Sequence, residues 1–97
     1  MISVELTFEA KDDLFDAVDY YEDKERRLRD EVATILNTVA SAPYLWSERS
    51  AGYRRVNCPV FPYYITYVIR DGIIVVVAIA ASRRKPGYWH GRLDLKK

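Results

Sequence analysis

The spacing of hydrophobic residues changes early in the chain, from the alternation of a strand to the periodicity of a helix. Ile2, Val4 and Leu6 alternate with polar residues, which predicts a half-buried strand over residues 2–7. The next apolar residues recur at the spacing of one helix face. They are Ala10, Leu14, Ala17, Val18 and Tyr21. Thr7 is placed to cap this helix, and Glu9 lies in its first turn, where the helix dipole favours an acid.

The same helical spacing returns after the polar stretch "DKERR". Its apolar positions are Leu28, Val32, Ile35, Leu36 and Val39. Pro43 ends this second helix, because the residue before a proline is pushed away from helical angles. Two helices with matching apolar stripes and a short polar joint predict a helical hairpin.

The chain changes character after Pro43. "YLWSERSAGY" reads as a loop, and "YRRVNC" as a strand that begins with Arg54 and Arg55. "FPYYITYVIR" has the alternation of a second strand. Asp71-Gly72 predicts a tight type I′ hairpin turn, because that turn needs positive φ at both central residues.

The strand predicted after this turn, residues 73–81 ("IIVVVAIAA"), is apolar on both faces. Such a strand belongs in the middle of a sheet that is covered on both sides. One helical hairpin covers only one face, so loops, the C-terminal segment or another molecule must shield the second. The predicted fold is α+β: an N-terminal strand, a helical hairpin and an antiparallel three-stranded meander.

Size and composition predict one small soluble domain over residues 1–97. Apolar residues make up 49% of the 97, enough for one core. Cys58 is the single cysteine, so no internal disulfide is possible, which fits a reducing cytoplasm. We expect this thiol to be a small buried apolar group rather than a nucleophile. No signal peptide is visible, and the apolar run at residues 73–81 is about half the ~20 residues that cross a membrane.

Charge is divided unevenly between the two parts of the chain. Residues 1–43 hold five Lys/Arg and eleven Asp/Glu, a net charge of −6. Residues 44–97 hold ten Lys/Arg and three Asp/Glu, a net charge of +7. This division predicts either an acidic and a basic side or simply solvated helices and loops.

An ordered set of motifs resembles the RelE/ParE superfamily of bacterial type II toxins. The motifs are "EAKDDLFDAVDYYE", "SAP", "YRRV", "FPYYITYVIRDGIIVVVAIAA" and "RRKPGYW", and together they span about residues 4–92. Two positions depart from the family pattern. Ala81 stands where many relatives have a histidine, three residues before Arg84. The joint between the helices lacks the glycine that is common in relatives.

The resemblance implies a cytoplasmic toxin that is neutralised by an antitoxin encoded beside it. The antitoxin of such a pair is ParD-like or related, wraps the toxin and connects it to operator DNA. Some members cleave mRNA on the ribosome, whereas the ParE branch poisons DNA gyrase. The second face of the sheet would then receive the antitoxin. No metal, cofactor or membrane is implied.

The resemblance leaves an enzyme and a protein-binding toxin as alternatives. A nuclease needs cations for the phosphate and Tyr or His to move protons. Its candidates here are Arg55, Arg84, Tyr88 and His90. His90 lies in a polar tail, which favours a surface role over catalysis. The weak proton-moving set, the acidic helices and the sequence pI of about 7.8 favour the non-enzymatic ParE branch and gyrase.

The cationic and aromatic end "SRRKPGYWHGR" is therefore predicted to hold the protein target. Its candidate target-binding residues are Arg83, Arg84, Lys85, Tyr88, Trp89 and Arg92. Two of them have a competing interpretation. Arg84 can instead pair with the acidic helix. Trp89 can instead return onto the core through the Pro86-Gly87 turn, and for Trp89 we favour this interpretation.

Overall fold

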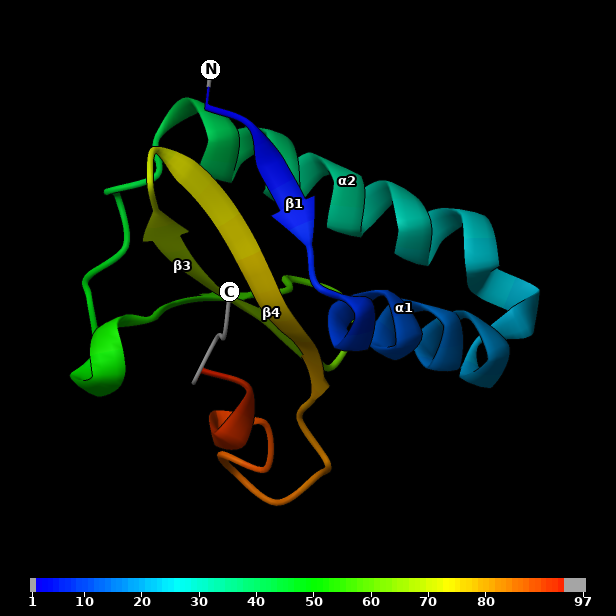
Figure 1. Ribbon diagram of the computed structural model, residues 1–97. Coiled ribbons are helices and arrows are strands. Elements are labelled where there is room, and N and C mark those ends of the chain that lie inside the picture. Colours follow the sequence, from blue (N-terminus) through cyan, green and yellow to red (C-terminus); the bar gives the residue numbers. More distant parts are fainter. Residues whose placement is uncertain (1, 94–97) are drawn as a thin grey trace.

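The computed structural model describes residues 2–93 and has a mixed four-stranded sheet with two helices packed on one face (Figure 1). The strands are β1 (Val4–Leu6), β2 (Arg54–Asn57), β3 (Tyr63–Arg70) and β4 (Ile73–Ala81). The helices are α1 (Phe8–Tyr20) and α2 (Glu25–Ser41). Short 3₁₀ turns are η1 (Glu22–Lys24), η2 (Ser50–Gly52) and η3 (His90–Leu93). The predicted α+β fold and its order of elements are confirmed.

Strand order in the sheet is β1-β4-β3-β2. The first strand runs parallel to β4, with Val4 opposite Ile74, and the other pairs are antiparallel. The helical hairpin is the crossover between β1 and the rest of the sheet. The longest and most apolar strand, β4, consequently lies inside the sheet, as predicted.

Both predicted ends of the helical hairpin are present. Thr7 Oγ1 accepts a hydrogen bond from the Ala10 N–H (3.1 Å) and so caps α1. The glycine-free joint is the 3₁₀ turn η1, and α2 ends at Ser41. Ala42, the residue before Pro43, leaves helical geometry with φ −144° and ψ 65°.

The β3–β4 hairpin has the predicted turn and one irregularity. Asp71 and Gly72 have φ of 54° and 74°, the positive values that a type I′ turn requires. The register shifts between Thr66 and Tyr67, so that Val77 is an extra residue in β4. Because of this bulge, Val77 and Ala78 both lie on the face away from the helices.

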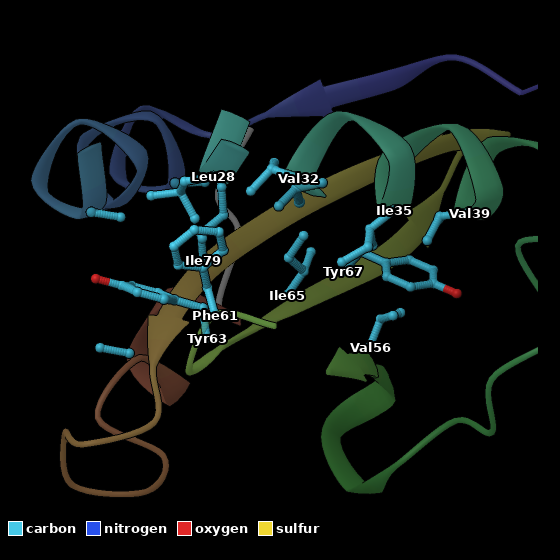
Figure 2. Packing of buried hydrophobic residues seen from close by; sticks show 14 of the residues in the cluster. Leu28, Val32, Ile35, Val39, Val56, Phe61, Tyr63, Ile65, Tyr67 and Ile79 are labelled. Carbon is cyan, nitrogen blue, oxygen red and sulfur yellow. The ribbon is translucent and has the colours of Figure 1, made fainter. Parts of the chain in front are cut away.

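The larger core lies between the helices and the sheet. Leu28, Val32, Ile35 and Val39 point from α2 toward the sheet in Figure 2. They meet residues of β2, β3 and β4 and of the loop before β3. These partners are Val56, Phe61, Tyr63, Ile65, Tyr67 and Ile79. This core is the expected result of the two helical stripes.

A second core on the opposite face is built by the chain's own C-terminal segment. Trp89 is only 2% exposed and packs with Tyr53, Tyr64 and the far face of β4. Val77, Ala78 and Ala80 on that face are fully buried. The expectation that an antitoxin covers this face is therefore wrong for Val77, Ala78 and Ala80, whereas Ile73 and Val75 of β4 stay partly exposed. The alternative prediction, that Trp89 returns onto the core, is confirmed.

Trp89 should therefore contribute strongly to stability. We expect Trp89→Ala to lower the free energy of unfolding by about 3–5 kcal/mol, because it leaves a cavity on β4. It also leaves the Tyr64 hydroxyl without the indole N–H that bonds it (2.9 Å). Urea denaturation followed by circular dichroism measures the change. Leu45→Ala, at a residue that is 68% exposed, is the control and should cost less than about 0.5 kcal/mol. Equal effects of the two variants would contradict the second core.

Candidate functional site

Among residues 2–93, no strand pairs with one backbone edge of β4 beyond Val76. Pairing with β1 stops at Leu6 and Val76, and the Thr7 N–H then bonds the Val76 carbonyl (3.1 Å). Beyond this point the side chains of Asp13 and Arg92, and no longer a strand, bond the backbone of β4. Asp13 Oδ2 accepts from the Ile79 N–H (3.0 Å), and Arg92 Nη1 donates to the Val77 carbonyl (3.2 Å). The pair satisfies backbone groups that would otherwise face α1 unpaired.

Asp13 and Arg92 also bind each other. Arg92 Nη1 lies 2.6 Å from Asp13 Oδ2, and Nη2 lies 3.3 Å from Oδ1, so the contact is bidentate. The two side chains are 11% and 23% exposed. Burial acts to lower the pKa of Arg92, but the hydrogen bond and charge of Asp13 outweigh it and the pKa rises. Arg92, which the sequence predicts to bind a target, thus holds the C-terminal segment against α1 and β4.

The turn after β4 places three cations at the surface. Arg83, Arg84 and Lys85 are exposed. The Arg84 guanidinium lies over the Tyr88 ring, 4.1 Å from its centroid. Arg83 lies over Tyr20 at the end of α1 at the same distance, 4.1 Å. Stacking on rings orients both guanidinium groups without using their N–H donors, and apart from the hydrogen bond of Arg83 with Tyr63 these donors can bind a partner.

Tyr88 and Arg83 both have shifted pKa values. Burial raises the pKa of Tyr88, and the Asp13 carboxylate raises it further against the opposing effect of Arg84 and Arg92. A hydrogen bond with Tyr63 raises the pKa of Arg83. Tyr88 is therefore a neutral phenol at physiological pH, able to donate a hydrogen bond and unsuited to removing a proton as a general base.

A small hollow lies between this turn and α1. Asp13 and Asp16 form its acidic wall, and Arg83 and Arg84 form its basic wall. Its volume of about 40 Å³ is far below the roughly 300 Å³ of a small-molecule site. The arrangement suits contact with another macromolecule better than enclosure of a substrate.

The remaining nuclease candidates, Arg55 and His90, make contacts of their own. Arg55 stacks over Tyr64 (3.8 Å to the ring centroid) and donates to Asn57 Oδ1 (3.0 Å). His90 is exposed and packs edge-on against Trp89 (4.4 Å between ring centroids). Arg55 and His90 are thus linked through Tyr64 and Trp89. Within residues 2–93, no hydrogen bond or ring contact joins either of them directly to Arg84 or Tyr88, although Tyr88 packs against the same cluster as Tyr64 and Trp89.

Two acidic residues do structural work that the sequence prediction missed. Asp13 caps the edge of β4, and Glu31 accepts from the backbone N–H groups of Val60 (3.1 Å) and Phe61 (3.0 Å). Their positions along the helices could have indicated these roles. Asp13 lies three residues after Ala10 and four before Ala17, and Glu31 three after Leu28, so each borders a buried stripe.

Residues 2–93 contain no group of three His, Cys, Asp or Glu side chains placed to share a metal ion. None of their helices combines the length and the apolarity that crossing a membrane requires.

Comparison with known proteins places the chain in a family. Residues 4–86 match the family described as ParE toxin of the type II toxin-antitoxin system, parDE. The match covers most of the sequence, so the chain belongs to the ParE toxin family, and the predicted ParE branch is confirmed.

A solved structure shares the fold. It is a chain of the chromosomal ParDE toxin-antitoxin system from P. aeruginosa, with a TM-score of 0.73 and 17% sequence identity. The alignment covers 84% of this chain and 96% of that chain. Comparison with curated protein sequences gives no significant match.

The Asp13–Arg92 pair should show measurable coupling. We expect a double-mutant cycle of Asp13→Ala and Arg92→Ala to give about 1–3 kcal/mol in the free energy of unfolding, because the pair is bidentate and mostly buried. The exposed pair Glu25–Arg29 (3.0 Å) is the control, with an expected coupling of about 0.3–0.5 kcal/mol. Urea denaturation of all variants measures both cycles. Equal coupling in the two pairs would show that Asp13 and Arg92 only meet at the surface.

Cys58 should be unreactive in the folded protein. Burial, together with the charge of Glu31, raises its pKa to about 12. Only about one thiol in ten thousand is then ionised at pH 8, against roughly one in four for an unperturbed cysteine. We expect iodoacetamide to label Cys58 at pH 8 only after guanidinium unfolds the chain, as measured by mass spectrometry. Rapid labelling of the native protein would contradict the raised pKa.

Proposed function

We propose that this ParE-family protein is a toxin that arrests bacterial growth by inhibiting DNA gyrase and is neutralised by a ParD-like antitoxin. The family match over residues 4–86 carries the proposal. The toxin acts as a binding protein in the cytoplasm, where gyrase and DNA are found. It reaches operator DNA only through its antitoxin.

The cationic turn after β4 supports this function. Arg83, Arg84 and Lys85 are exposed next to one another, and stacked tyrosines orient the two arginines. Oriented guanidinium groups bind carboxylates and phosphates with defined geometry, so the turn can recognise an acidic surface of a large target. We assign target binding to these three residues and to the partly exposed Tyr88. Trp89 and Arg92 support them from within the fold.

A ribosome-dependent mRNA nuclease is the second candidate. The stacked pair of Arg84 and Tyr88 favours it, since a neutral Tyr next to a cation can protonate a leaving oxygen. The lack of a direct contact between this pair and Arg55 or His90, among residues 2–93, weighs against it. Residues 82–88 of the turn itself include no histidine or carboxylate that could act as the matching base.

Purified toxin can separate the two activities. We expect loss of supercoiling, or trapped cleavage complexes, when the toxin is added to gyrase and plasmid DNA, and no cuts in mRNA on translating ribosomes. Addition of the antitoxin should restore gyrase activity. Codon-dependent mRNA cleavage with unaffected gyrase would instead establish the nuclease.

Arg84 should be needed for toxicity. We expect Arg84→Glu to lower growth arrest at least tenfold in cells without antitoxin, because it reverses a charge at the target-binding turn. Colony counts after induction measure the loss, and circular dichroism checks the fold. Arg26→Glu is the matched control, because Arg26 is an exposed cation on α2 without an ion pair among residues 2–93. Undiminished toxicity of Arg84→Glu would remove Arg84 from the site.

A further inference from the structure

The outward side of α1 combines exposed aromatic rings with carboxylates. Phe8 is 75% exposed and Phe15 is 60% exposed, although large apolar side chains usually lie inside. The two residues are seven positions apart, so they lie on the same side of the helix, about 10.5 Å from each other along its axis. Asp12 and Asp19 occupy the same side and are exposed as well. We call these four residues the acidic-aromatic face.

This face does not take part in the fold. The helix packs on the sheet through the opposite side, where Ala10, Ala17 and Val18 are buried. Among residues 2–93, the side chains of Asp12, Asp16 and Asp19 make no ion pair or hydrogen bond, and Asp13 is the one α1 residue whose carboxylate does. Figure 1 shows α1 at the outside of the molecule, beside α2.

The face also carries a cost in the isolated protein. The helix has five acidic residues and one lysine, and Asp16 lies four residues from Asp12 and three from Asp19. Like charges at these spacings destabilise a helix, and phenylalanines that are 60–75% exposed leave most of their apolar surface in water. Both costs disappear if a cationic apolar surface covers the helix.

We propose that the acidic-aromatic face binds a cationic amphipathic helix of another polypeptide. Apolar residues of the partner, spaced seven apart, would cover Phe8 and Phe15, as in other recognition of amphipathic helices. Lysine or arginine residues beside them would pair with Asp12 and Asp19. The inference stands on α1 and does not depend on gyrase as the target.

Charge favours this occupant over two others. An anionic membrane repels a face that carries several aspartates. A second copy of the same face is repelled for the same reason. A cationic helix satisfies both the rings and the carboxylates.

A designed peptide provides the probe. It is an 18-residue helix with leucines along one face and lysines beside them, labelled for fluorescence anisotropy. One control peptide replaces every lysine by glutamate, and another has the same composition with the leucines spread around the helix. We expect the lysine peptide to bind at least tenfold more tightly than either control, and its binding to weaken as salt is added.

Variants then locate the site on the protein. Phe8→Ser with Phe15→Ser should weaken binding at least tenfold, and Asp12→Asn with Asp19→Asn should remove most of the salt dependence. The matched control is Tyr44→Ser with Leu45→Ser, which alters two equally exposed apolar residues elsewhere (66% and 68% exposed) and should bind normally. All changed side chains lie at the surface, so unchanged circular dichroism and urea midpoints are expected.

Several results would overturn the proposal. Equal binding of the lysine and glutamate peptides, no binding of the lysine peptide, or an equal effect of the control variant would each do so. Sedimentation that shows a dimer abolished by the phenylalanine variants would identify a second copy as the occupant. Binding to vesicles with anionic lipids that depends on Phe8 and Phe15 would identify a membrane.

Discussion

Every other feature of this protein depends on keeping both faces of β4 away from water. Nine successive residues of this strand are apolar, and a bulge at Val77 turns two neighbours toward the same face. The helical hairpin covers one face with a conventional stripe of aliphatic side chains. The other face is covered by Trp89, which is held by Tyr53 and by the Tyr64 hydroxyl. Without this ring the sheet would present a large apolar surface to water.

The way in which Trp89 is held in place also shapes the functional surface. The chain must leave β4, reverse and return within seven residues, and Gly87 makes this possible with φ +77°. As a result of this reversal, Arg83, Arg84 and Lys85 lie exposed in the turn. Further along, Arg92 fastens the returning segment to Asp13 and to the bare edge of β4. One short segment therefore completes the core and presents the cations, so stability and target binding are linked through it.

Charge is sorted by element rather than spread evenly. Asp13 faces the sheet and is the one acidic residue of α1 whose side chain is paired among residues 2–93. The other α1 carboxylates face outward. Three neighbouring cations, Arg83, Arg84 and Lys85, lie beyond the end of β4. The molecule therefore has two surfaces of opposite character, one cationic at the turn and one acidic and aromatic on α1. Each suits a partner of the opposite charge, which allows two partners to be recognised in different ways.

Local patterns in the sequence were sufficient to predict the elements. Helical stripes, the Thr7 cap, the proline that ends α2 and the Asp-Gly turn each depend on neighbours a few residues apart, and all were found in the structure. The resemblance of the ordered motifs also led to the correct family. The Pro86-Gly87 turn favoured the return of Trp89 for the same reason, because it acts over a short distance.

Contacts between distant segments were decided only by the tertiary structure. Asp13 and Arg92 are separated by 79 positions, and Glu31 is separated by 30 from Phe61, whose N–H it holds. Neither pair could be predicted, because hydrophobic periodicity shows which side of an element is buried but not which polar group meets it. For a related reason, the sequence leaves loops, the C-terminal segment and a partner as alternative covers for the second face of the sheet. A sequence shows that an apolar strand must be covered on both sides, whereas only packing in three dimensions decides which segment covers it.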